Sequence, residues 1–181
     1  MPRVFLALTL PPEVRSALAV VQFLLPLPRR VEPETFHLTL AFLGEVPGAL
    51  LHDVHDALEA VRSPAFALTL RGAGLFGGAR PRAAWVGVAP CAALDRLQAK
   101  VAFAAHRAGA PPEARKFVPH VTLGRFAPPA PDEVMRLERA VAGQAGFVAG
   151  PFAVTEFALM ESHVSARGSR YDALARYPLE G

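Results

Sequence analysis

The chain contains one short pattern twice, FHLTL at residues 36–40 and PHVTL at residues 119–123. Each copy places a histidine and a threonine two residues apart in an apolar run. With six histidines in 181 residues and six threonines, random placement gives only about 0.2 matches to His-x-Thr. The second copy therefore needs an explanation, and the pattern predicts a site built from paired histidines.

Alternation along a β-strand explains why the two polar residues of each copy belong together. Side chains two residues apart project from the same face of a strand. His37 then stands beside Thr39, and His120 beside Thr122, while the apolar residues between and after them face the buried side. A single copy would describe an ordinary half-buried strand with a hydrogen-bonded core histidine. Two copies favour a shared site.

Two histidines that face one phosphate can divide the proton transfers of phosphoryl transfer. The ordinary pKa of histidine, near 6.5, makes the neutral and the protonated forms both accessible at neutral pH. In-line displacement places the attacking and leaving oxygens on opposite sides of phosphorus. The residues alone leave open which histidine is the acid, and this scheme requires neither a metal nor another cofactor.

Length and composition indicate one soluble globular domain. The 181 residues are 52% hydrophobic and 19% charged, which suffices to bury a core. We expect a cytoplasmic protein, because the N-terminal apolar stretch lacks a cleavage site and Cys91 is the single cysteine. The net charge is +3, and arginine supplies 17 of the 19 basic residues, so an anionic partner is only weakly favoured.

Hydrophobic periodicity predicts alternating strands and helices. We expect strands at 3–10, 36–43, 66–70, 84–88, 118–126 and 152–160, with a short last one near 171–177. Helices are expected after Pro12, over 50–61, around 94–105 and over 133–142, the last capped by Asp132.

These elements form two approximate repeats, residues 3–76 and 83–160. We therefore expect an α+β fold with one bilobal domain over residues 1–181. Its two αβ lobes would be related by a pseudo-twofold axis, with mainly antiparallel sheets flanking a central cleft. Such symmetry would bring both His-x-Thr strands to the cleft.

Two other patterns resemble ligand sites and are set aside. Residues 72–77 satisfy G-x-G-x-x-G but are followed by a loop rather than by a helix, so no dinucleotide cofactor is expected. His52 and His55 lie near Asp53 and Asp56 on one expected helix. A solvated helical face explains them better than a metal site, because no further ligand has a recognisable spacing.

Several arginines and two phenylalanines could border the cleft. The arginines near expected strand ends or loops are Arg80, Arg82, Arg125, Arg167 and Arg170, although each alone is typical of a solvated surface. Phe42 and Phe126 follow the two motifs and could stack on a base, although strand phenylalanines usually belong to the core.

The residues around both motifs resemble the two-histidine phosphoesterases, specifically the bacterial RNA 2',3'-cyclic phosphodiesterase family, also called 2'-5' RNA ligases. HLTLAFLG at 37–44 and FVPHVTLGR at 117–125 are similar to the two signatures of that family. RVFLAL at 3–8, GLF at 74–76, WVGV at 85–88 and the tail around Tyr171 and Tyr177 fit its pattern as well.

The resemblance implies hydrolysis of an RNA 2',3'-cyclic phosphate to a 2'-phosphomonoester, with reversible 2'-5' RNA ligation as a related activity. It implies that His37 donates a proton to the departing 3' oxygen and that His120 activates water. Thr39, Thr122 and Arg125 would bind the phosphate. The expected partner is RNA with a cyclic phosphate end, such as a tRNA fragment. The protein would be a monomer that binds no membrane.

Two alternatives remain at this point. The same cleft could hold RNA ends or nucleotides without chemistry, or the enzyme could act on small cyclic nucleotides. The product formed from an RNA with a cyclic phosphate end distinguishes binding from hydrolysis, because hydrolysis adds one water.

Overall fold

A computed structural model describes residues 1–165 and 168–181 of the chain. The strands of these residues are β1 (Arg3–Thr9), β2 (His37–Glu45), β3 (Phe66–Phe76), β4 (Ala83–Val88), β5 (His120–Arg125), β6 (Val148–Val154), β7 (Glu156–Ser165) and β8 (Gly168–Pro178). The helices are α1 (Pro12–Leu24), α2 (Gly48–Glu59), α3 (Ala92–Arg107), α4 (Pro131–Ala142) and the 3₁₀ turn η1 (Pro33–Thr35).

The strands form one sheet in the order β6-β3-β4-β5-β2-β1-β7-β8. Every pairing of neighbouring strands in it is antiparallel. The sheet divides naturally between β5 and β2, which pair through Leu38 and Val121. Each half has four strands, and each contributes one of the His-x-Thr strands to the junction. The α+β fold class with antiparallel strands is confirmed.

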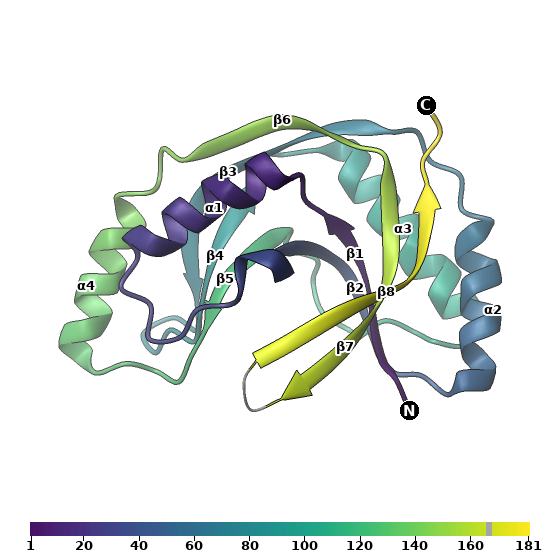
Figure 1. Cartoon of the computed structure of the whole chain (residues 1–181), viewed down its shortest axis with the longest axis horizontal. Helices are drawn as coiled ribbons and strands as arrows, with labels where there is room; N and C mark the ends of the chain where they lie inside the picture. The colour runs from purple at the N-terminus through teal and green to yellow at the C-terminus, as the bar shows by residue number, and fades with distance from the viewer. Residues whose placement is uncertain (166–167) are drawn as a thin grey trace.

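The helices cover the two halves of the sheet in pairs. Helix α1 contacts β5 and β6 and α4 contacts β3, whereas α3 contacts β2 and α2 contacts α3 and β8. Figure 1 shows α1 and α4 at one end of the molecule and α2 and α3 at the other. The chain crosses between the halves repeatedly: β3 follows α2 but pairs with β4 and β6.

The main core lies on one face of the sheet, between the strands and these helices. It includes Leu38, Leu40, Val121 and Leu123, the apolar residues of the two motifs. Because side chains alternate along a strand, both histidines face the other side of the sheet. A small second apolar cluster lies on that side, formed by Phe5, Ala7, Ala158 and Met160 with Phe42 and Tyr171 packed against it.

Three sequence-based expectations about local structure were wrong. The last strand, expected to be short and near 171–177, is the 11-residue β8 (Gly168–Pro178). The segment expected as one strand over 152–160 is two strands, separated at Thr155. The chain leaves β3 there and joins β1 in the other half of the sheet, as the path of β6 into β7 shows in Figure 1. Asp132 does not cap α4: Ala130 is the N-cap residue, and the Glu133 carboxylate accepts its backbone N–H at 3.0 Å.

The G-x-G-x-x-G string lies within β3 and the turn that follows it, which agrees with the expectation that it opens no helix. Among residues 1–165 and 168–181, no helix is both long enough and apolar enough to cross a membrane.

Candidate active site

His37 stands at the start of β2, and both nitrogens of its ring are hydrogen-bonded. Its Nδ1 lies 2.7 Å from the carbonyl oxygen of Thr35. A carbonyl can only accept, so Nδ1 bears a proton. Nε2 lies 3.1 Å from Oγ1 of Thr39. In the neutral ring, the Thr39 hydroxyl donates to Nε2, and this nitrogen is the one that gains or loses a proton.

His120 stands at the start of β5 and repeats the arrangement. Its Nδ1 donates to the carbonyl of Val118 at 2.6 Å, again two residues before the histidine. The Nε2 of His120 is therefore also the titrating nitrogen. Two backbone carbonyls thus set the same tautomer and ring orientation in both motifs.

The register between β2 and β5 brings the two motifs together. Leu38 pairs with Val121 in an antiparallel arrangement. Continuing that register by one residue in each direction places the histidine of each motif opposite the threonine of the other. His37 is thereby opposite Thr122, and Thr39 is opposite His120. Diagonal neighbours in such a pair are about 7–8 Å apart, so the two imidazoles can contact one small anion from two sides.

Aromatic rings pack against each imidazole. The ring centroid of His37 lies 5.0 Å from those of both Phe5 and Tyr171, and the Tyr171 contact is edge-on. His120 has an edge-on contact with Phe76 at 4.9 Å and a tilted one with Trp85 at 6.5 Å. Phe5 lies on the strand beside β2, and Trp85 on the strand beside β5. Each histidine is therefore packed against two aromatic rings, one of them on the neighbouring strand.

The electrostatic environment disfavours the charged form of both rings. Burial lowers the pKa of His37 below its usual 6.5, the hydrogen bond to Thr35 opposes this, and the positive charges of Arg125 and His120 lower the pKa further. Burial likewise lowers the pKa of His120, against the bond to Val118, and Arg125 and Arg115 add to the decrease. Arg125, at the end of β5, is therefore close enough to act on both histidines.

Cavities adjoin both histidines. One of about 300 Å³ is lined by His37, Phe5, Arg3, Arg125 and Tyr171 among others. One of about 400 Å³ is lined by His120 and Thr39, with Phe42, Phe76 and Phe117. A smaller one brings His37, Thr122 and Arg125 together. The five predicted site residues are thus divided among three cavities, and Phe42 and Arg115 line both of the larger ones.

Arg115 was missed by the sequence reasoning. It lies in the loop between α3 and β5 and lines both of the larger cavities. Its guanidinium lies over the Phe42 ring, 5.1 Å from the centroid, and pairs with Glu113. The Glu113 backbone N–H donates to the Phe42 carbonyl at 2.9 Å. The basic pair at 115–116, just before the second motif, was the available signal.

The other candidates fall outside this arrangement. Arg170 pairs with Asp172 at 2.9 Å on β8, and Arg80 and Arg82 line none of the three cavities described above. Arg167 lies outside the described residues. Phe126 packs against the main core, whereas Phe42 borders both of the larger cavities.

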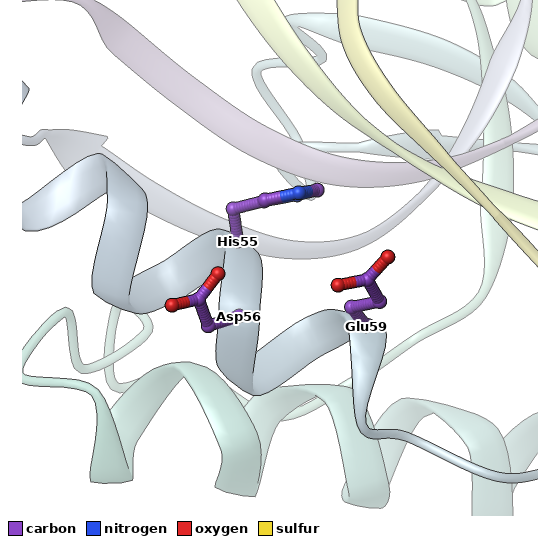
Figure 2. Close-up of side chains that lie close together, drawn as sticks. All are labelled: His55, Asp56 and Glu59. Atoms are coloured by element: carbon purple, nitrogen blue, oxygen red, sulfur yellow. The ribbon is translucent and has the colours of Figure 1, made fainter.

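Within residues 1–165 and 168–181, helix α2 contains the one group of histidine and carboxylates whose ligand atoms are close enough together to hold a metal ion. Its members differ from the pattern set aside above. His55, Asp56 and Glu59 have potential ligand atoms within 4.8 Å of one another. Figure 2 shows these three side chains on the helix. Both carboxylates are exposed, and the His55 Nδ1 is hydrogen-bonded to the Tyr177 hydroxyl at 3.0 Å. Burial, Glu59 and Asp56 raise the pKa of Tyr177 to about 12, so its proton stays in place. The group is explained as a helix surface anchored on Tyr177.

Comparison with known proteins identifies the family. The 2'-5' RNA ligase superfamily matches residues 10–166. The RNA 2',3'-cyclic phosphodiesterase of Escherichia coli (strain K12) is 34% identical over 181 residues, which cover 98% of this chain and 96% of that protein. The crystal structure of E. coli LigT complexed with 3'-AMP has a TM-score of 0.80 and 31% identity, covering 99% of each chain. The chain belongs to the 2'-5' RNA ligase superfamily.

Some relatives are longer than the matched region. The RNA 2',3'-cyclic phosphodiesterase of Geobacillus stearothermophilus is 34% identical over 164 residues, which cover 87% of this chain but 49% of that protein. The chain therefore spans about half the length of that relative.

Proposed function

We propose that the protein hydrolyses RNA 2',3'-cyclic phosphate ends to 2'-phosphomonoesters, using His37 and His120 as the acid and base. The observation that supports this most strongly is the matched pair of imidazoles: each has its Nδ1 proton committed to a backbone carbonyl and its Nε2 left as the titrating atom. The names of the relatives point to the same reaction.

In the proposed reaction, neutral His120 accepts a proton through Nε2 from a water molecule as its oxygen bonds to phosphorus. The bond between phosphorus and O3' breaks on the opposite side, and protonated His37 gives its Nε2 proton to O3'. One water is added, and the product keeps its phosphate on O2'. Proton exchange with solvent then restores both histidines. The choice of His37 as acid rests on the family resemblance.

Thr39, Thr122 and Arg125 are proposed to bind the non-bridging oxygens. The hydroxyl of Thr39 lies 3.1 Å from the Nε2 of His37. When His37 is protonated, Nε2 no longer accepts from this hydroxyl, which can then donate its proton to a phosphate oxygen. Arg125 acts electrostatically on both histidines, so its positive charge is placed to offset the charge that develops on the phosphate oxygens. The scheme needs no metal ion.

The same residues allow 2'-5' ligation. If the 5'-hydroxyl of a second RNA takes the place of water, His120 removes its proton, O3' leaves as before, and the product is a 2'-5' phosphodiester. We also propose a single bilobal domain that works as a cytoplasmic monomer on RNA such as tRNA fragments; the single Cys91 agrees with a reducing compartment.

Incubation with a short RNA that ends in a 2',3'-cyclic phosphate tests the proposal. Hydrolysis increases the mass of the RNA by one water, whereas a binding module leaves the mass unchanged. A parallel reaction with a cyclic mononucleotide tests the small-substrate alternative, which predicts that the mononucleotide is turned over faster than the RNA.

A further inference from the structure

A third cavity, of about 220 Å³, adjoins the site on its His37 side. Its lining includes Arg29, Arg30, Glu32, Arg125, Ser169 and Tyr171. Arg125 and Tyr171 also line the cavity that contains His37, so the two spaces share a wall. The lining residues include three arginines and one glutamate, so the lining carries a net positive charge.

The side on which the RNA must lie follows from the proposed reaction, on which this inference rests. Water attacks opposite O3', and His37 gives its proton to O3'. The ribose attached to O3' is therefore on the His37 side of phosphorus, and so is the rest of the RNA strand that continues from its 5' carbon. The apolar cavity beside His120 is on the opposite side, where the attacking group enters.

The loop that supplies the arginines is held firmly against β5. The buried Gln22 of α1 donates through Nε2 to the carbonyls of Val31 at 2.7 Å and Leu123 at 2.8 Å. The Val31 N–H donates to the same Leu123 carbonyl at 3.0 Å. A β-carbon on Gly124 would lie 2.5 Å from the carbonyl oxygen of Arg29. The loop backbone at Arg29 is thus packed onto the strand that ends in Arg125.

Arg29 is available for a ligand. Arg30 donates to the Leu25 carbonyl at 3.3 Å, and Arg29 has no side-chain hydrogen bond or ion pair with any residue of 1–165 or 168–181. A guanidinium recognises a phosphate oxygen pair well. Because the loop is already fixed, binding costs little additional backbone ordering.

We propose that the Arg29–Arg30 cavity binds a backbone phosphate of the RNA strand on the 5' side of the cyclic phosphate. The site would then select an RNA end over a cyclic mononucleotide, because only the RNA has an internucleotide phosphate to place there.

The test compares two substrates: a short RNA ending in a 2',3'-cyclic phosphate, and a 2',3'-cyclic mononucleotide. We expect Arg29→Ala to lower the ratio of kcat/KM for RNA to kcat/KM for the mononucleotide about fivefold, the effect of one exposed charge pair. The salt dependence for RNA should become shallower by about 0.7 on a log–log plot. Arg29→Lys keeps the positive charge and should retain most of the wild-type ratio of kcat/KM for RNA to kcat/KM for the mononucleotide. Arg96→Ala, which removes an exposed arginine on α3, is the matched control.

The outcomes separate the inference from the proposed function. A wild-type protein that turns over neither substrate overturns the proposed function, and the inference with it. A wild-type protein that turns over both, combined with an unchanged ratio in Arg29→Ala, overturns the inference alone. An equal decrease in Arg96→Ala overturns it too, because the effect would then reflect net charge rather than this cavity.

Discussion

Leu38 of β2 pairs with Val121 of β5 at the junction of the two halves of the sheet. This buried pair sets the geometry of the site. The residues on either side of it pair a histidine of one motif with the threonine of the other. A shift of one residue would turn the polar side chains of one motif into the core. The apolar residues of the motifs thus position the polar ones.

Replacing either histidine should abolish most turnover without unfolding the protein. Both side chains border cavities and lie outside the main core, so His37→Ala and His120→Ala should retain the fold. Loss of one proton-transfer group should lower kcat/KM roughly 100- to 10,000-fold. Thr39→Val and Thr122→Val should be milder. Steady-state kinetics on a cyclic-phosphate RNA measures this, with the exposed His106→Ala as control. Activity near wild type in either histidine variant would contradict the proposed roles.

The pH dependence should reflect the lowered pKa values. The base must be neutral and the acid protonated, so kcat/KM should follow a bell centred between the two pKa values of the free protein. Burial lowers both below 6.5, and the maximum should therefore lie on the acidic side of pH 6.5. Arg125→Gln should move the maximum to higher pH, because Arg125 lowers the pKa of both histidines. A wild-type maximum above pH 7.5 for kcat/KM would contradict this account of the site.

Gln22 should matter for stability. It is only 5% exposed, and its Nε2 donates to two carbonyls. In Gln22→Leu the Val31 carbonyl loses its side-chain donor, whereas the Leu123 carbonyl still accepts from the Val31 N–H. The free energy of unfolding should fall by about 1–3 kcal/mol. Urea denaturation measures this. Gln98→Leu is a matched control, since Gln98 is half-buried and makes one longer bond of 3.3 Å to the Leu40 carbonyl. Equal losses in both variants would show that the Gln22 bonds have no special role.

Metal chelation should leave turnover unchanged. The proposed chemistry uses only side chains, and the His55 group on α2 is explained by its bond to Tyr177. Dialysis against EDTA should therefore keep kcat within about twofold of the untreated protein, within the range of a surface effect. If EDTA does lower kcat, His55→Ala shows whether the helix α2 group holds the metal. A matching loss of activity in this variant would assign a metal role to α2, contrary to the prediction.

The His-x-Thr pair could be predicted from the sequence because the signal is periodic and repeated. Alternation fixes which residues share a face, and the repeat indicates that two such faces meet. The α+β class and most strand and helix positions followed from the same periodicity. Arg125 was expected to bind phosphate, and the structure places it beside both histidines.

What could not be predicted depends on contacts between distant segments. Arg115 belongs to a loop without periodicity, and only its packing over Phe42 places it at the site. At Thr155 the chain does not reverse direction but changes the strand with which it pairs, from β3 to β1. The sequence there is a largely apolar run and therefore contains no turn signal. The role of Gln22 depends on carbonyls of two remote segments. In each case the structure is determined by a contact with a residue far away in the sequence, which the local sequence pattern does not reveal.

The most direct test of the central claim is the mass and phosphate position of the product formed from a short RNA with a 2',3'-cyclic phosphate end. We expect that the wild-type protein adds one water and leaves the phosphate on O2', and that His37→Ala and His120→Ala form this product roughly 100-fold or more slowly. A 3'-phosphate product, or an RNA that the wild-type protein binds without any change in mass, would contradict it.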